Sequence, residues 1–219
     1  MGAEELNSFA RSAYDYGFRR DAHQLIDWGY QDALPAIHSK LLEEEITGLI
    51  VEAIEERLDD PFTPERFDRY SIDEEKPIAV EGRKGKKRRR LDLAVVSGHS
   101  RPRPRYIFEA KRLRKNGYPI GKYLGEDGLK CFIQGVYASQ YPEAAMIGYV
   151  QSDTASYWEL ELQRSFDKDL NNDLCVVQLL QKVKVLSSMP DVWLSKHGRM
   201  AGNVIAVHHI FLDCSASSD

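Results

Sequence analysis

Two short apolar runs interrupted by charged residues constrain the fold of this chain more than any other feature of its sequence. Residues 91–96 contain Asp92, and residues 106–111 contain Glu109 and end on Lys111. Apolar runs of this length that are bounded by turn-forming residues are typical of β-strands. A charged side chain inside an apolar strand costs free energy unless it is paired or binds something. The two runs therefore predict a pair of strands and, where their charges meet, a functional site.

The two runs are expected to pair as an antiparallel hairpin. The segment between them, residues 97–104, is rich in Ser, Gly and Pro, which favour turns. If Asp92 lies opposite Glu109, the turn is centred in the middle of this segment. Directly opposed residues have Cβ atoms about 5 Å apart, and strand alternation places Glu109 and Lys111 on one face. The sequence thus predicts that two carboxylates and an amine converge.

This combination of groups suits hydrolysis. Carboxylate oxygens are ligands that Mg²⁺ prefers, and a bound divalent ion can activate a water and stabilise charge on a phosphate. An amine beside the carboxylates can orient the attacking water. The leading hypothesis from these residues is metal-dependent cleavage of a phosphodiester bond, with Mg²⁺ as the cofactor and Mn²⁺ as its substitute.

Basic residues are concentrated around these runs. Between positions 83 and 115, fourteen basic residues stand against two acids, so this stretch carries +12, and the −4 of the whole chain leaves −16 for the remainder. Such asymmetry favours a polyanion-binding surface around one site, the alternative being a solvated basic loop. The residues predicted to bind nucleic acid are Arg83, Lys86, Lys87, Arg88, Arg89, Arg90, Arg101, Arg103 and Arg112.

The composition bounds the class of protein. A chain of 219 residues with 42% hydrophobic and 29% charged residues is typical of one globular domain. No apolar run approaches the roughly 20 residues that span a membrane, and the first residues lack the basic and apolar parts of a signal peptide. The three cysteines contain no CxxC pair, which argues against a zinc or iron–sulfur site built from cysteine. We expect a cytoplasmic protein with reduced thiols and no membrane partner.

The spacing of apolar residues predicts one domain that mixes helices and strands. An amphipathic helix is expected at 35–58, because its apolar residues recur at the spacing of one buried face. The other predicted elements are helical residues 1–35, strands at 77–81, 91–96 and 106–111, a turn at 82–87, a helix at 128–140, a strand at 145–151, a helix capped by Asp153 and ending near 167, a helix or strand at 174–187, a hairpin of 192–195 with 204–214, and loops at 60–75 and 112–127. The domain, 1–219, is accordingly divided into a helical extension (1–35), a catalytic core (36–151) and C-terminal helices and strands (152–219).

Several residues match a known pattern within this order of elements. The amphipathic helix carries Glu43-Glu44-Glu45, the second strand carries Asp92, the third carries Glu109-Ala110-Lys111, and the following helix carries Gln134. The order and these residues resemble the core of the PD-(D/E)XK nuclease superfamily, the restriction-endonuclease-like fold, over about residues 40–151. The chain departs from one branch of the family, in which a tyrosine follows the glutamine by four positions, since Tyr137 follows Gln134 by three.

The resemblance implies a fold and a set of roles. The fold would be α/β, a restriction-endonuclease-like core with a central mixed β-sheet flanked by helices and an N-terminal helical extension. Asp92, Glu109 and the backbone carbonyl of Ala110 would hold Mg²⁺. Lys111 would orient the attacking water or help to activate it.

The resemblance also implies that side chains from the helices predicted at 35–58 and 128–140 assist the reaction. Glu43, which lies three residues before the buried Ile46, borders the apolar stripe and is the preferred acid for a second metal or a metal-bound water. Glu44 is the second choice among the three acids, and Glu45 stays open as well. Gln134 would assist from the following helix.

The implied activity leaves alternatives open. The resemblance favours a nuclease that acts on DNA, as an endonuclease, and a role in defence against foreign DNA is common among members of this build. One alternative is a nuclease-like module without catalysis that binds nucleic acid or a partner. Another is a nuclease that is inactive alone and is switched on by a targeting or activating protein partner or by formation of a homo-oligomer. The chain has no separate DNA-reading motif such as a zinc finger, which leaves room for such a partner.

Overall fold

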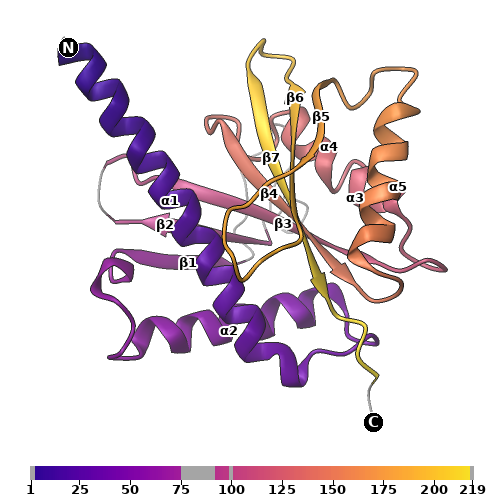
Figure 1. Cartoon of the computed structure of the whole chain (residues 1–219), viewed down its shortest axis with the longest axis horizontal. Helices are drawn as coiled ribbons and strands as arrows, with labels where there is room; N and C mark the ends of the chain where they lie inside the picture. Colours follow the sequence, from indigo (N-terminus) through magenta and orange to yellow (C-terminus); the bar gives the residue numbers. More distant parts are fainter. Residues whose placement is uncertain (1–2, 75–91, 99–100, 218–219) are drawn as a thin grey trace, which may run out of the picture.

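A mixed β-sheet of seven strands forms the centre of the structure, a computed structural model that describes residues 3–74, 92–98 and 101–217 (Figure 1). The strands follow the order β1-β2-β3-β4-β7-β6-β5 across the sheet. Their bounds are β1 (Tyr70–Glu74), β2 (Leu93–Ser97), β3 (Arg105–Leu113), β4 (Glu143–Val150), β5 (Val176–Lys182), β6 (Val192–Gly198) and β7 (Val204–Asp213).

The three central strands run parallel and the outer strands antiparallel. β3 pairs in parallel with β4, and β4 with β7, whereas β1-β2-β3 and β7-β6-β5 pair antiparallel. Parallel neighbours need a crossover connection, which α3 (Ile120–Leu124) and α4 (Leu129–Ile133) supply between β3 and β4. The helix α5 (Ala155–Asp167) begins the connection from β4 towards β7. The predicted α/β class, a central mixed sheet flanked by helices, is therefore confirmed.

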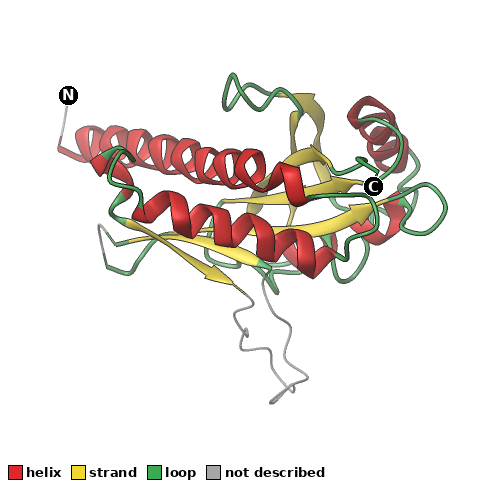
Figure 2. Ribbon diagram, turned by 90° about the horizontal axis from the view of Figure 1, so that it is seen from below, coloured by secondary structure: helices red, strands yellow, loops and turns green. Residues whose placement is uncertain are grey.

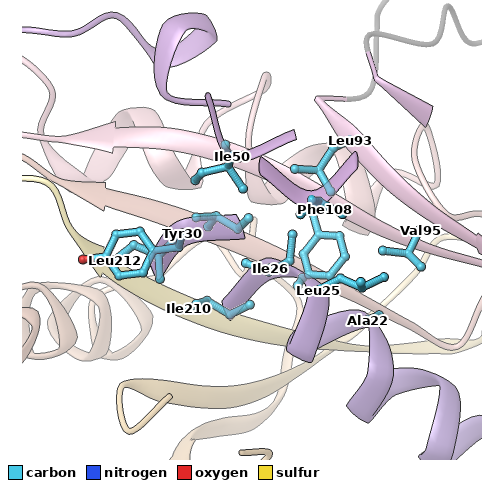
Figure 3. Close-up of a cluster of buried hydrophobic side chains, with 14 of the residues drawn as sticks. Ala22, Leu25, Ile26, Tyr30, Ile50, Leu93, Val95, Phe108, Ile210 and Leu212 are labelled. Atoms are coloured by element: carbon cyan, nitrogen blue, oxygen red, sulfur yellow. The ribbon is translucent and has the colours of Figure 1, made fainter. Parts of the chain in front are cut away.

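Two long helices, α1 (Ala3–Ala33) and α2 (Glu43–Asp59), lie side by side over one face of the sheet (Figure 2). Their buried side chains share one apolar cluster with the strands, as Figure 3 shows for Leu25, Ile50 and Phe108. The predicted N-terminal extension thus contributes to the core from Phe18 onwards. Within the described ranges, none of the helices combines the length and the apolar content needed to cross a membrane.

The helices α3, α4 and α5 form a second apolar cluster with the sheet, separate from the first. The stripe that α5 contributes consists of Trp158, Leu162 and Phe166, spaced four residues apart. Thr154 caps this helix, because its hydroxyl accepts the backbone N–H three residues later at 3.2 Å. The predicted cap, Asp153, is therefore wrong by one residue.

The helix predicted at 35–58 begins later, at Glu43. The chain first makes a 3₁₀ turn at Leu34–Ala36 and then leaves helical geometry. Glu45 Oε2 accepts the backbone N–H of Leu42 at 2.6 Å, which satisfies a free donor at the start of α2 and fixes the start there. This late start places the three acids in the first turn of the helix.

The loops predicted on either side of the charged hairpin contain regular elements. Residues 60–75 include β1, which pairs with β2, and residues 112–127 include α3. These two predictions are wrong because the segments are short and carry weak apolar periodicity. The predicted strand at 77–81 and turn at 82–87 lie outside the described residues.

The helix predicted at 128–140 is much shorter in the structure. α4 ends at Ile133, and the backbone of Gly135 takes a φ of +69°, which a right-handed helix cannot contain. The remaining C-terminal predictions hold. The strand predicted at 145–151 is β4, and the predicted final hairpin is β6 with β7. The segment 174–187, for which the sequence allows either a helix or a strand, contains β5.

A buried arginine holds the irregular segment that follows α4. Arg199, in the turn between β6 and β7, donates from Nε to Phe132 O at 2.9 Å and from Nη2 to Ala138 O at 2.9 Å. Its Nη1 donates to the carbonyls of Ser139 and Tyr141, each at 3.2 Å. A guanidinium carries five donors in a fixed plane, so one side chain organises four backbone carbonyls, of which those of Phe132 and Ala138 also accept backbone N–H groups.

Replacing Arg199 with Met is expected to lower the free energy of unfolding by roughly 2–5 kcal/mol, because buried carbonyls left without donors keep their desolvation cost. Urea denaturation followed by circular dichroism measures this. Arg164→Met is the matched control, since Arg164 is 61% exposed and pairs only within its helix with Glu161. Its loss should change the free energy by less than about 0.5 kcal/mol. Equal losses for the two variants would contradict the role of Arg199.

A chain of buried polar groups lies on the α5 side of the sheet. Leu174 O accepts from Nδ1 of His197 at 2.7 Å, so Nε2 of that ring must accept from the Ser195 hydroxyl at 2.7 Å. Ser195 Oγ then accepts from His209 Nε2 at 2.8 Å, and His209 Nδ1 accepts from the Tyr123 hydroxyl at 2.9 Å. This chain of hydrogen bonds requires that the rings of both His197 and His209 are neutral. Burial lowers the pKa of His197 to about 4 and the pKa of His209 well below its usual value.

His197 is expected to weaken folding in acid. The unfolded chain binds its proton near pH 6.5 and the folded protein only near pH 4, so stability is full above pH 6.5 and falls as the pH drops towards 4. One such proton contributes a slope of about 1.4 kcal/mol per pH unit in this window. Glutamine cannot titrate. In His197→Gln, the slope of the unfolding free energy against pH should therefore be smaller than in the wild type by about 1.4 kcal/mol per pH unit. Identical slopes for the variant and the wild type would refute this.

Candidate active site

The hairpin of β2 and β3 has the register that the sequence predicts. Leu93 pairs with Phe108. Continuing this register by one residue places Asp92, which directly precedes β2, opposite Glu109. The Asp92 carboxylate also accepts the backbone N–H of Ala110 through Oδ2 at 2.6 Å. This bond fixes the carboxylate against β3 at the open end of the hairpin.

Glu109 and Lys111 share one face of β3, as strand alternation predicts. Phe108 and Ala110 belong to the apolar cluster under α1 and α2. Leu113, two residues beyond Lys111, belongs to the cluster of α3, α4 and α5. The two charged side chains therefore leave β3 on the side of the second cluster.

The ammonium group of Lys111 lies among three carboxylates. Its Nζ is 2.9 Å from Glu43 Oε1, 3.0 Å from Glu109 Oε1 and 3.7 Å from Asp92 Oδ2. It also donates to the backbone carbonyl of Ala110 at 2.6 Å. The structure thus brings together, from α2, from the residue before β2 and from β3, groups that the sequence assigned to one site. We call these four side chains and the Ala110 carbonyl the carboxylate–lysine cluster.

Among the three acids of α2, Glu43 is the one that lies in the cluster. Its Oε1 accepts from Lys111, and its Oε2 accepts the backbone N–H of Arg112 at 2.9 Å. Glu44 and Glu45 are exposed, and Glu45 is used to cap the helix. The first turn of α2 therefore directs one acid to the sheet and leaves the next two in solvent.

The carboxylates differ in their access to solvent. The side chain of Glu109 is 3% exposed, whereas those of Asp92 and Glu43 are 26% and 27% exposed. The cluster is therefore closed behind Glu109 and open at Asp92 and Glu43. Among the described residues, the side at Asp92 and Glu43 is the one from which a ligand can reach the cluster.

Burial and mutual charge shift the protonation equilibria. Burial, followed by the negative charge of Asp92, raises the pKa of Glu109 well above its usual range. Burial also raises the pKa of Asp92, although Lys111 opposes the shift. Burial alone would lower the pKa of Lys111, but the charges of Glu109, Asp92 and Glu43 outweigh it and raise this pKa. Lys111 is therefore a cation at neutral pH.

The donors of the cluster fit the hard divalent cation that the sequence suggests. All of its acceptors are carboxylate or carbonyl oxygens, which Mg²⁺ prefers. Glu109 Oε2 is buried and has no hydrogen-bond partner in the described part of the chain, so a cation would offset a desolvation cost that is otherwise uncompensated. The same described part contains no preformed group of three or more His, Cys, Asp or Glu side chains for a metal. The ammonium of Lys111 lies among the acids instead.

Gln134 lies apart from the cluster. Its side chain is exposed just beyond α4, and its amide donates to Glu126 Oε2 at 2.8 Å. The prediction that it joins the site depended on a helix over 128–140, and the structure has no helix at residue 134 to direct it there.

The basic residues predicted to flank the site are divided by the hairpin. Arg101 and Arg103 are exposed in the turn between β2 and β3, at the end opposite to the carboxylates. The five residues of β2 separate the two ends by roughly 17 Å. That this turn binds nucleic acid stays a prediction, and the structure places such a contact at the end of the hairpin away from the carboxylates. The predicted basic residues at 83–90 lie outside the described residues.

Arg112 is next to the cluster but faces another direction. Its guanidinium carbon lies 3.8 Å from the centroid of the Tyr118 ring, and Nη1 is 3.5 Å from Leu41 O. Its backbone N–H, rather than its charge, touches the cluster through Glu43.

Three further residues at the site escaped sequence reasoning. The hydroxyl of Tyr149 is 2.9 Å from that of Thr47, and Gln151 Nε2 donates to Leu41 O at 2.8 Å. These contacts join β4 and its end to the start of α2, about 100 positions earlier in the chain. The polar residues at the end of an apolar strand were the one signal that could have indicated them.

Comparison with known proteins gives no match for this chain. No protein-family model, no curated protein and no solved structure matches this chain. The function is therefore inferred from the residues of the cluster and from their geometry.

Proposed function

We propose that this protein is a metal-dependent nuclease that hydrolyses phosphodiester bonds, with DNA as the favoured substrate, and that its fold is restriction-endonuclease-like. The meeting of Glu43, Asp92, Glu109 and Lys111 in one cluster carries the proposal. Two of these residues are 68 positions apart in the chain. The order α2, β1-β2-β3, α3 with α4, and β4 also supports it, because this is the order that the resemblance requires.

Asp92, Glu109 and the Ala110 carbonyl would hold Mg²⁺, for which Mn²⁺ would substitute, and Glu43 would hold a second metal or a water. The bound cation would supply Lewis-acid chemistry, lowering the pKa of a water and stabilising charge on the phosphate. Glu109 is the central donor in this assignment, since its Oε2 is buried and the described residues offer it no hydrogen-bond partner.

Lys111 would orient the attacking water or help to activate it. Without a metal, the charges of Glu109, Asp92 and Glu43 raise the pKa of Lys111 and favour its charged form. Its N–H groups point at oxygens of Glu43, Glu109 and Ala110. A donor in this place can orient a water or a phosphate oxygen and can offset the negative charge that develops in the transition state.

Exposed cations in the turn that follows β3 support a polyanionic substrate. Arg114 and Lys115 lie three and four residues beyond Lys111 in an exposed turn, which is closed by backbone hydrogen bonds of 3.0 Å between Arg114 and Tyr118. Cations in such a turn can bind the phosphate backbone without reading its sequence. Endonuclease activity, a role in defence against foreign DNA, and a targeting partner or homo-oligomer belong to the proposal through the resemblance.

A non-catalytic module is the second candidate, and one observation favours it. The ammonium of Lys111 compensates the carboxylates by itself, as it would in a purely structural ion cluster. A module of this kind would bind nucleic acid or a partner protein without a metal. Metal occupancy at Asp92 and Glu109 separates the two candidates.

Lys111→Ala is expected to reduce cleavage by at least about 100-fold, because one preorganised donor to a developing negative charge contributes about 2.7–4 kcal/mol. The assay uses circular and linear, single- and double-stranded substrates with Mg²⁺. Lys168→Ala, which changes an exposed lysine at the end of α5, is the control and should cleave like the wild type. Circular dichroism verifies that both variants are folded. Undiminished cleavage by folded Lys111→Ala, or no cleavage of any nucleic acid by the wild type, would sink the proposal.

Removing divalent ions with a chelator should abolish cleavage, and Mg²⁺ or Mn²⁺ should restore it. Because a ligand that binds only the folded state stabilises it, Mn²⁺ should also raise the temperature of unfolding. Glu109→Gln should remove this rise, whereas Glu44→Gln should keep it, since Glu44 is exposed beside the cluster. If Mn²⁺ leaves the unfolding temperature of the wild type unchanged, the protein is the non-catalytic module.

A further inference from the structure

Two buried hydroxyl groups connect the sheet to the backbone of Glu43. Thr47 Oγ1 donates to the Glu43 carbonyl at 3.0 Å. A threonine hydroxyl has a single proton, so the 2.9 Å contact between Thr47 and Tyr149 is a bond that the Tyr149 hydroxyl donates. The hydrogen bonds therefore run in one direction, from β4 through Thr47 to the first residue of α2.

Both hydroxyls are buried in an apolar environment. Tyr149 and Thr47 are shielded from solvent, and the surrounding cluster includes Ile46, Ile50 and Ala110. Phenylalanine and valine have nearly the same shapes, and replacing both partners of a buried hydrogen bond by apolar groups can be nearly neutral for stability. Apolar side chains would fill the same space but would make neither of the two directional hydrogen bonds. These bonds fix the orientation of the first turn of α2 relative to the sheet.

The start of α2 is held at two further points by the same part of the sheet. Gln151 Nε2 donates to Leu41 O at 2.8 Å, and the backbone N–H of Arg112 donates to Glu43 Oε2 at 2.9 Å. Tyr149 and Gln151 are two residues apart and so face the same side. Arg112 pairs with Tyr149 in the register of β3 and β4. The backbone and the carboxylate of Glu43 are thus both positioned from one pair of strands.

We infer that Tyr149, acting through Thr47, is a positioning residue for Glu43, which it holds against Lys111 so that the cluster has the geometry that the reaction requires. This inference rests on the proposed function, because it gives Glu43 a part in the chemistry. The phosphate-binding cations proposed above, Arg114 and Lys115, lie in the turn beyond β3. Loss of the hydroxyls should therefore affect the chemical step more than the binding of nucleic acid.

Tyr149→Phe and Thr47→Val test the inference, since each removes one hydroxyl and little volume. We expect each to lower kcat by about tenfold or more, because a misplacement of about 1 Å can cost about 100-fold in rate. KM for nucleic acid should stay within about twofold, and the affinity for Mn²⁺, measured by calorimetry, should fall. The double variant should be no worse than the single variants, because both break one chain. Thr47→Ser keeps the hydroxyl and should restore kcat.

Tyr106→Phe is the matched control. Tyr106 is also buried on the α1 and α2 side of the sheet, but its hydroxyl is 2.9 Å from His208 Nδ1 rather than next to α2. It should lose stability comparably and keep both kcat and the affinity for Mn²⁺.

The outcomes separate this inference from the proposal on which it rests. If the wild type cleaves DNA but Tyr149→Phe matches Tyr106→Phe in kcat and in affinity for Mn²⁺, the positioning role is wrong and the nuclease proposal stands. If kcat falls only in step with the unfolding temperature in Tyr149→Phe, or if Thr47→Ser loses as much kcat as Thr47→Val, the hydroxyls are merely structural. If the wild type neither cleaves nor binds Mn²⁺, the proposed function fails and the inference falls with it.

Discussion

The positive charge of Lys111 is the interaction on which the site depends. Three carboxylates lie within 3.7 Å of its ammonium, and one of them, Glu109, is almost inaccessible to water. Two like charges about 4 Å apart repel each other by about 4 kcal/mol at an effective dielectric constant of 20, so acids gathered this closely favour a cation among them or the protonation of one of them. Lysine and a divalent metal meet this need in the same way. The same arrangement is therefore suited both to a stable folded protein and to the proposed metal site, in which a cation would stay beside the phosphate of the proposed substrate.

The topology of the sheet brings these charges to one place. β3 is the strand at which the antiparallel half of the sheet meets the parallel half. Its antiparallel neighbour delivers Asp92, and its parallel neighbour β4 provides Tyr149, which holds the start of α2 through Thr47. The N-terminal end of a helix carries partial positive charge, which further favours the Glu43 carboxylate there. The apolar cluster of α1, α2 and the sheet then keeps α2 from moving away.

Sequence reasoning succeeded where the determining interactions are local. The register of β2 with β3 follows from a short turn and from alternation, so the approach of Asp92 to Glu109 could be derived from the positions of the residues alone. It failed where the deciding signal is neither apolar periodicity nor strand alternation. The start of α2 depends on a cap by Glu45, and the shortness of α4 on the left-handed backbone at Gly135. Gln134 was preferred by resemblance, whereas the glutamine that lies beside the site is Gln151, which only the pairing of β4 and the docking of α2 place there.

The distribution of charge around the open side of the cluster restricts how a polyanion can approach. The outer face of α2 is acidic along its whole length, because its exposed residues include Glu44, Glu45, Glu52, Glu55 and Glu56. These negative charges repel the phosphates of a nucleic acid over about a Debye length, which is about 8 Å at physiological salt. The turn after β3 presents Arg114 and Lys115. A phosphate backbone should therefore lie along this turn and away from α2, so that Glu43 meets the substrate at the boundary between a repelling and an attracting surface. Within the described part of the chain, this asymmetry favours approach of the proposed substrate along the turn after β3.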